Sequence, residues 1–201
     1  MSWHAELSLS TPLTGSVNGE ERFAHFPRHY TIKGMYFSRV LATLGDGLRE
    51  VEDKLVDPPR MGRYLPFRDY PQVDYSRLCL AAASRSWPTQ SVPEAMRRLA
   101  RLDFQQFAGS RVGRVTLALT GDLASSLRKL PDMYRMSIKG GRVTAREEDD
   151  GMRIEFEDFH GWPECYALGT LEGIVQHYGK HPRIHAAFHS ESHATYLVHL
   201  S

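Results

Sequence analysis

Histidines are the residues in this sequence whose type and spacing could most readily do chemistry. Seven of them stand between residues 160 and 199: His160, His177, His181, His185, His189, His193 and His199. An imidazole can bind a transition metal, and a single one is enough to hold a haem iron as its axial ligand. A protein metal site, in contrast, needs three or four ligands that converge at about 2 Å from the ion.

The spacing of these histidines does not by itself make a metal site. His177 and His181 are four residues apart, but Gly179 interrupts any helix that would align them. His185 and His199 are expected to be cross-strand neighbours, and no carboxylate or thiol obviously joins them. We therefore expect a solvated sheet face and predict no cofactor. His185 and His199 stay as the metal candidates, and haem stays as the alternative cofactor.

A nucleophile for covalent catalysis is not indicated by the sequence. No G-x-S-x-G elbow occurs, and the acidic run Glu147 to Asp150 is interpreted as the solvated tip of a hairpin. Cys165 could pair with His160 or His177, but it is predicted to lie on an apolar helix face, where a thiol is inert. We predict no catalytic residue and favour a protein that is not an enzyme.

The charge of the chain gives no general attraction to nucleic acid. The 201 residues carry a formal net charge of +1, and 41% of them are apolar. Phosphate binding needs a concentrated basic surface. The clustered arginines are interpreted instead as polar helix faces and not as an anion groove: Arg97, Arg98 and Arg101, and again Arg111 and Arg114. Nucleic acid is therefore not expected among the partners.

The expected compartment is the cytoplasm. Cys79 and Cys165 are too few for a disulfide framework and lack metal-site spacing, so both are expected to be buried free thiols. The N-terminus lacks the basic and apolar pattern of a signal peptide. No window approaches 18 uninterrupted apolar residues, so no membrane span is expected.

The elements that would position a site fall into three parts. Residues 1–28 are rich in Ser, Thr, Gly and Asn and are predicted to form an N-terminal arm. Residues 29–201 are predicted to be a single α+β domain. Within it, residues 29–133 are mainly helical, and residues 134–201 read as a β-β-α-β-β module.

Periodic apolar residues predict the helices of the first part, over residues 35–44, 74–86, 91–107 and 122–130. Asp74 is expected to cap the second helix. Ser91 with Glu94 three residues later is a capping box for the third. Pro131 is expected to end the fourth helix.

The loop of residues 60–71 is rich in aromatic residues and prolines. We interpret it as a surface-crossing loop that Tyr64, Phe67 and Tyr70 pin to the domain. This interpretation is favoured over a surface on which nucleic-acid bases stack.

The C-terminal module is the most regular part of the sequence. A first strand is expected from Met136, interrupted near Gly140, and residues 152–159 alternate as a half-buried strand. Pro163 opens a helix in which Gly169 and Gly173 make a smooth patch for close approach to a sheet. With these strands, we predict N-terminal helices packed on a four-stranded antiparallel sheet.

The closing hairpin, residues 183–200, has a register that can be argued from its apolar residues. Pairing Ile184 with Leu200 and Phe188 with Tyr196 puts the bulky apolar side chains on one face. This register sets His185 opposite His199 and implies a three-residue loop.

Several phrases of the sequence resemble a known family. They are IKGMYFSRVLATL, the stretch YPQVDYSRLCLAAASRSWPTQSVPEAMRRLARLDFQQFAGSRVGRVTLAL, LRKLPDMYRM, and FHGWPECYALGTLEGIVQHYG with the closing hairpin. Over about residues 30–201 the chain resembles the myxobacterial paralogous domain family of unknown function. That family is distantly similar to four-vinyl-reductase-type domains, H-NOX haem sensors and Bet3-like trafficking subunits. The resemblance implies helices on one face of a four-stranded antiparallel sheet, often with a pocket for an apolar ligand.

The chain also departs from these distant relatives. The Tyr-x-Ser-x-Arg motif of H-NOX proteins is absent, because Tyr134 and Ser137 have the wrong spacing. The zinc-binding cysteine cluster of phenol-sensing relatives is absent as well. Where relatives show Gly and Thr, this chain has Gln105 and Gln106 before Phe107.

We therefore predict a non-enzymatic ligand-sensing or adaptor domain with an apolar small-molecule pocket between helices and sheet. The pocket is predicted at Phe104, Phe107, Cys165 and Leu168. A protein partner or a homodimer is expected to receive the signal. Two alternatives stay open: a purely structural protein–protein interaction module, and a haem or metal sensor that uses the C-terminal histidines.

Overall fold

The structure, a computed structural model, describes residues 5–7, 9 and 11–200. Its helices are α1 (Gly19–Ala24), α2 (Phe37–Leu44), α3 (Gln72–Ser86), α4 (Val92–Gly109), α5 (Arg111–Ala118), α6 (Leu123–Ser137) and α7 (Leu168–His177). Short 3-10 turns are η1 (Gly34–Tyr36), η2 (Gly45–Glu50) and η3 (Glu52–Lys54), and η4 (Pro163–Ala167) is a π-helical turn. The strands are β1 (Ala5–Leu7), β2 (Thr31–Lys33), β3 (Asp69–Pro71), β4 (Ile138–Lys139), β5 (Arg142–Glu148), β6 (Gly151–Glu157), β7 (Ile184–Ser190) and β8 (His193–His199).

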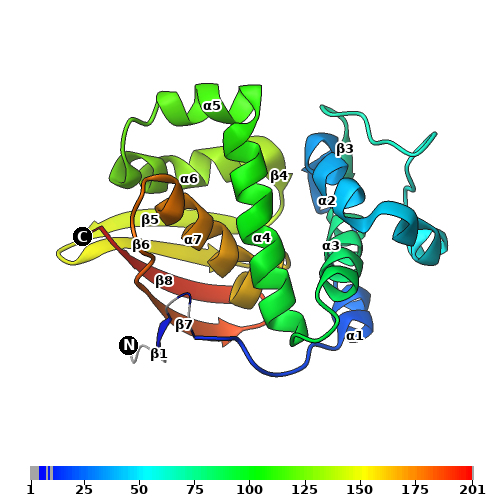
Figure 1. The fold of residues 1–201 in the computed structure, drawn as a ribbon, viewed down its shortest axis with the longest axis horizontal. Helices are drawn as coiled ribbons and strands as arrows, with labels where there is room; N and C mark the ends of the chain where they lie inside the picture. Colours follow the sequence, from blue (N-terminus) through cyan, green and yellow to red (C-terminus); the bar gives the residue numbers. More distant parts are fainter. Residues whose placement is uncertain (1–4, 8, 10, 201) are drawn as a thin grey trace.

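The main sheet is antiparallel and has the order β1-β7-β8-β6-β5. Helices α6 and α7 lie over this sheet, and α4 stands between them and the lobe that contains α1, α2 and α3 (Figure 1). A smaller sheet, β3-β2-β4, joins the two parts. The α+β class and the four antiparallel strands of the C-terminal module are confirmed. The strand β1, from the predicted arm, adds a fifth strand beside β7.

The alternation predicted for residues 152–159 is confirmed in β6. Met152, Ile154 and Phe156 are fully buried, whereas the residues between them point to the outer face. This sheet face and helices α6 and α7 share one hydrophobic core. A second core lies between α2, α3 and the start of α4. The two cores meet along α4.

The register predicted for the closing hairpin is wrong by two residues. Ile184 pairs with Val198, and Phe188 pairs with Ala194. A β-bulge after Phe188 absorbs one residue, so that the turn has two residues where three were expected. Because the shift is an even number, the apolar side chains keep the core face that the sequence predicted.

Pro131 does not end α6, which continues to Ser137. A proline inside a helix costs about 3 kcal/mol, so packing beyond it must hold the last turns. Tyr134 supplies that packing, since its ring lies 5.6 Å from both Phe156 and Phe159. Met136 is therefore helical, and the strand expected there begins only at Ile138.

Asp74 is not the cap of α3, which begins at Gln72. Its buried carboxylate accepts hydrogen bonds of 2.8 Å from the backbone N–H groups of Val56 and Asp57. Asp74 thus anchors the segment that precedes β3. The cap predicted at Ser91 is confirmed, because its hydroxyl accepts from the N–H of Glu94.

Gly169 and Gly173 face α4 and not the sheet. A Cβ on Gly169 would stand 2.1 Å from the carbonyl oxygen of Arg97, so the two helices touch backbone to backbone. Arg97 itself is fully buried and ion-paired with the buried Glu172 of α7, which corrects its expected place on a polar face. Arg101 donates to the same carboxylate at 2.7 Å.

The aromatic loop is pinned by only two of the three predicted rings. Tyr64 and Tyr70 are buried against Phe37, at ring-centroid distances of 4.0 and 5.6 Å. Phe67 is 82% exposed, which corrects its expected anchoring role. Within the described residues, none of the helices combines the length and the apolar character that a membrane span needs.

Candidate ligand pocket

A cavity of about 120 Å³ lies where the two hydrophobic cores meet. Its walls come from α2, α3, α4, α6, η4 and α7, so it touches both the helical lobe and the sheet-bearing part. The apolar part of the lining includes Ile32, Ala100, Phe104, Phe107, Leu130, Met133, Ile138, Phe159 and Ile174. The polar part includes Tyr36, Arg39, Gln72, Tyr75, Ser76, Asp103, Ser137, Tyr166 and Thr170.

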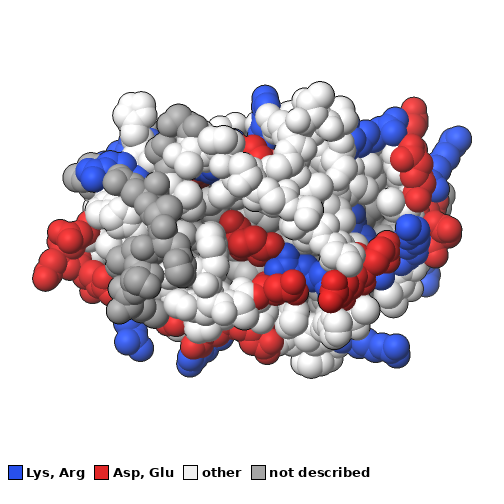
Figure 2. Space-filling model, turned by 90° about the horizontal axis from the view of Figure 1, so that it is seen from below, with Lys and Arg blue, Asp and Glu red and all other residues white. Residues whose placement is uncertain are grey.

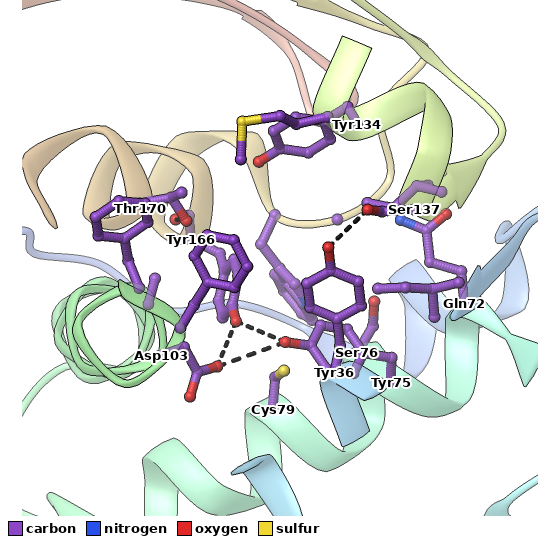
Figure 3. A pocket seen from close by; sticks show the side chains of 18 of the residues that line it. Tyr36, Gln72, Tyr75, Ser76, Cys79, Asp103, Tyr134, Ser137, Tyr166 and Thr170 are labelled. Atoms are coloured by element: carbon purple, nitrogen blue, oxygen red, sulfur yellow. Dashed lines mark hydrogen bonds between the residues drawn. The ribbon is translucent and has the colours of Figure 1, made fainter. Parts of the chain in front are cut away.

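One corner of the cavity is a hydroxyl–carboxyl cluster, drawn in Figure 3. Tyr166 donates its hydroxyl to Oδ2 of Asp103 at 2.5 Å. The hydroxyl of Tyr75 lies 2.7 Å from that of Tyr166 and 3.5 Å from the same carboxyl oxygen. Both tyrosine hydroxyls thus donate to the same carboxyl oxygen, Tyr75 over the longer distance. Three elements, α3, α4 and η4, therefore meet through one carboxyl group.

The electrostatics of this corner are governed by burial. Removal from water raises the pKa of Asp103 to about 6, although the hydroxyls of Tyr166 and Tyr75 and the Arg39 guanidinium favour the ionised form. Burial also raises the pKa of Tyr75 and that of Tyr166 well above the ordinary tyrosine value. Near neutral pH the cluster thus holds two neutral phenols beside a carboxyl that is close to its titration point.

Cys79 lies in the same wall, and its thiol is fully buried. Burial, with the nearby Asp103 adding to it, raises the pKa of its thiol well above the ordinary value. A protonated thiol is a poor nucleophile. The cavity therefore has no activated group for covalent chemistry among the lining residues that the structure describes.

Three polar atoms of the cavity lining have no hydrogen-bond partner among the described residues. They are Oδ1 of Asp103, Oε1 of Gln72 and Nε1 of Trp162, and all three atoms are buried. A buried polar atom without a partner costs about 1–3 kcal/mol. At the other end of the cavity Tyr36 and Ser137 already satisfy each other at 2.6 Å. A bound molecule or water that reached one of these atoms would recover part of that cost.

The structure brings together two of the four residues predicted for the pocket. Phe104 and Phe107 both line the cavity, with ring centroids 6.1 Å apart. Cys165 and Leu168 are fully buried, one in each hydrophobic core, and are not among the lining residues. Of the four residues predicted for the pocket, the two on α4 therefore lie at the cavity.

The predicted metal candidates lie away from the cavity. His185 pairs with Leu197 and not with His199, although the two imidazole rings are diagonal neighbours 5.0 Å apart. Among the described residues, Glu155, Glu157 and His193 are the group whose ligand atoms lie within 4.8 Å of one another. Arg142 is ion-paired with Glu157, so part of that negative charge is already balanced.

The sequence analysis missed the hydroxyl–carboxyl cluster, although one signal was present. Asp103 stands three residues after Ala100 and four before Phe107, inside the apolar stripe of α4. A carboxyl on the buried face of a helix needs hydrogen-bond donors from another element. The main donor, Tyr166, lies in the π-helical turn η4. No residue spacing in the sequence of this turn signals that it would face Asp103.

The described cavity does not fit a haem. A volume of about 120 Å³ is small against the roughly 300–1,000 Å³ of sites for drug-sized ligands and cofactors. No histidine is found among the described residues that line it. Its thiol and the Tyr75 and Tyr166 hydroxyls, which could serve as anionic axial ligands, have raised pKa values and hold their protons.

Comparison with known proteins gives a family and a fold. The family model described as "Protein of unknown function (DUF2378)" matches residues 27–199. No curated protein matches the chain with significant similarity.

Two solved H-NOX proteins illustrate the likeness of fold. The Fe(II) unliganded H-NOX protein from K. algicida aligns with a TM-score of 0.62 at 14% identity, over 85% of this chain and 97% of that one. The H-NOX protein from S. oneidensis in the Fe(II)NO state aligns with a TM-score of 0.63 at 15% identity, over 85% and 99%. At such identities the likeness is one of fold.

Proposed function

We propose that this chain, which belongs to the DUF2378 family of unknown function, is a non-enzymatic ligand-sensing domain. It binds one small, uncharged and largely apolar molecule in the cavity between the helical lobe and the sheet-bearing part. The observation that carries the proposal is the cavity with its buried carboxyl, whose second oxygen lacks a partner among the described residues.

The size of the cavity limits the ligand to about one substituted ring. An engineered apolar cavity of about 150 Å³ holds a benzene molecule and stays free of water without it. The cavity here is slightly smaller, at about 120 Å³. Larger molecules would have to push α4 and α6 apart.

The polarity of the lining selects the ligand's functional groups. The rings of Phe104 and Phe107 offer an apolar surface, and the buried carboxyl of Asp103 offers an acceptor oxygen. A hydroxyl or amide on the ligand would satisfy that oxygen and recover part of its desolvation cost. A carboxylate ligand would meet the Asp103 charge in a poorly hydrated site, and we expect it to be excluded.

A sensing role follows from the elements that the ligand would touch. Asp103 is on α4, Met133 is on α6 and Tyr75 is on α3, so one molecule would contact both parts of the domain. A ligand shifts a conformational equilibrium when it binds one conformation more tightly than the other. A molecule that contacts both parts would do so if their packing differs between the two conformations. A protein partner or a second copy would read that shift. The two buried free cysteines suit the cytoplasm, where thiols stay reduced.

The experiment titrates three probes that differ in one group: toluene, benzyl alcohol and benzoate. We expect benzyl alcohol to bind best and benzoate not at all, measured by calorimetry and by the rise in unfolding midpoint. A ligand at ten times its dissociation constant stabilises the folded state by about 1.4 kcal/mol. No binding by either uncharged probe would refute the proposal.

A matched pair of variants in α6 ties the binding to the cavity. Met133 lines the cavity, whereas Met136 is exposed in the same helix. Met133→Trp fills the space and is expected to abolish binding of benzyl alcohol. Met136→Trp makes the same chemical change outside and is expected to leave binding unchanged. Equal effects of the two substitutions would mean that the probe binds elsewhere.

A further inference from the structure

The exposed loop before β3 presents bulky apolar side chains beside arginines. In residues 60–68, Met61 is 92% exposed and Phe67 is 82% exposed, and Leu65 is exposed as well. Arg60 and Arg63 are exposed and have no ion-pair partner among the described residues. Exposed bulky apolar side chains lower the solubility of a protein, and a group of them commonly marks an interaction site.

Hydrogen bonds fix the backbone of this loop, so Phe67 is held in an exposed position. The N–H of Leu65 donates to the buried hydroxyl of Tyr70 at 2.9 Å. The carbonyl oxygens of Pro66 and Arg68 accept from Met35 and Gly34, both at 2.9 Å. Phe67 stands between these two anchored residues, and its ring is held outward.

A tight turn brings the two free arginines to the tip of the loop. Met61 and Gly62 both have left-handed backbone, with φ of 53° and 74°. Arg60 and Arg63 consequently pair across the turn, with the N–H of Arg63 donating to the carbonyl of Arg60 at 3.2 Å. The loop thus ends in two cations beside an apolar residue.

Helix α5 repeats the same combination. Val112, Val115 and Leu119 are exposed and follow the spacing of one helical stripe. The opposite side of α5 packs closely against the end of α4, since a Cβ on Gly113 would stand 1.8 Å from the carbonyl oxygen of Phe107. Arg111 and Arg114 flank the stripe.

The charge of these two segments has a single sign. Residues 58–68 contain three arginines, residues 104–121 contain two, and neither segment contains an Asp or a Glu. An acid adjoins each end of both segments, Asp57 and Asp69 for the first and Asp103 and Asp122 for the second, so the positive charge is confined to the segments themselves. Of these five arginines, Arg68 is the one with an ion-pair partner among the described residues, Asp57.

Both segments reach the same edge of the molecule. In Figure 1 helix α5 and the loop that leads into β3 lie along the upper edge of the ribbon. Figure 2 views the molecule from below, on the side away from this edge, and shows acidic and basic side chains interspersed there. The two segments that combine exposed apolar side chains with arginines therefore lie along one edge of the ribbon (Figure 1).

We propose that residues 58–68 and helix α5 dock this protein onto the surface of an anionic lipid bilayer. Phe67, Leu65 and the α5 stripe would enter the boundary between headgroups and acyl chains, while the arginines contact anionic headgroups. A second copy is a poorer occupant, because a symmetric contact would set these arginines against one another. The docking does not rest on the ligand pocket.

The test is co-sedimentation with vesicles of phosphatidylcholine alone and of equal parts phosphatidylcholine and phosphatidylglycerol. We expect binding to the anionic vesicles alone, and weaker binding as salt is added. The double variant Arg60→Gln/Arg63→Gln should weaken binding about 25-fold, because each arginine near an anionic surface contributes about five-fold. Phe67→Ser should weaken it about ten-fold through lost apolar insertion, and Phe67→Trp should retain it.

Matched controls keep the proposal open to refutation. Arg146 is exposed on β5, so Arg146→Gln makes the same charge change as Arg60→Gln or Arg63→Gln alone, but away from the docking edge, and should leave binding unchanged where each single loop variant weakens it about five-fold. Circular dichroism verifies that each variant is folded. The proposal is overturned if wild-type protein ignores the anionic vesicles, or if the control weakens binding as much as the loop variants. It is also overturned if ultracentrifugation finds a dimer that Phe67→Ser dissociates.

Discussion

Asp103→Asn is the perturbation that probes the pocket's carboxyl most directly. Asparagine keeps the size of the side chain and the acceptor for Tyr166, but it cannot ionise. The pKa of Asp103 is about 6 in the folded protein against a reference value of 3.8. The difference corresponds to roughly 3 kcal/mol of pH-dependent free energy of unfolding.

The sign of this contribution follows from which state holds the proton more tightly. The folded protein does, so the stabilising contribution is complete below about pH 4 and is lost as the pH rises to about 6. Asp103→Asn lacks this dependence. Relative to wild type, the variant should therefore gain about 3 kcal/mol of stability between pH 4 and pH 7.

The assay is urea unfolding of both proteins at several pH values between 4 and 7. The difference in free energy of unfolding between the two proteins cancels the contributions of all other titrating groups. Tyr166→Phe serves as a second variant, because losing the hydroxyl that favours the ionised carboxyl should move the window to higher pH. A difference between Asp103→Asn and wild type that stays constant with pH would refute the reasoning, and so would one of opposite sign.

Three further predictions concern the scaffold and the cofactor. Glu172→Gln should cost about 3–5 kcal/mol in urea unfolding, because it removes the fully buried carboxylate that pairs with Arg97 and leaves that cation only the partly exposed Glu94 among its acidic partners described, whereas Glu50→Gln in the exposed pair with Arg85 should cost under about 1 kcal/mol. Gly169→Ala should cost about 1–3 kcal/mol, since its Cβ would meet α4 backbone, whereas Gly109→Ala meets nothing and should stay within about 0.5 kcal/mol. Haemin added to the purified protein should give no stoichiometric Soret band, because the cavity and its lining do not fit it.

The sheet could be predicted because its pattern is local. Alternation in β6 fixes which face is buried without knowledge of any other element, and Met152, Ile154 and Phe156 are all buried as expected. The hairpin register failed because a bulge at its end leaves no mark in the apolar pattern. A shift of two residues preserves the faces, so the pattern could not distinguish the two registers.

The errors in the helical part have a common cause in tertiary contacts. Pro131 is tolerated because Tyr134 packs on Phe156 and Phe159 beyond it. Arg97 is buried because Glu172, 75 residues later, supplies its counter-charge. Such partners are distant in sequence, and neither residue type signals them.

Two residues at the cavity could be predicted because their pattern is local to one helix. Phe104 and Phe107 follow the helical period of α4, which made their burial on one side predictable. Cys165 and Leu168 belong to the same helical face of the later segment, but close contact through Gly169 turns that face onto α4 and into the cores. Phe67 shows the converse case, an aromatic residue whose exposure only the anchored loop backbone explains.

The most direct measurement is a crystal structure of the protein soaked with benzyl alcohol. We expect electron density for one molecule in the cavity, with its ring against Phe104 and Phe107 and its hydroxyl within hydrogen-bond distance of the Asp103 carboxyl. A cavity that is empty or holds only water at saturating benzyl alcohol would contradict the claim that this domain binds a small ligand there.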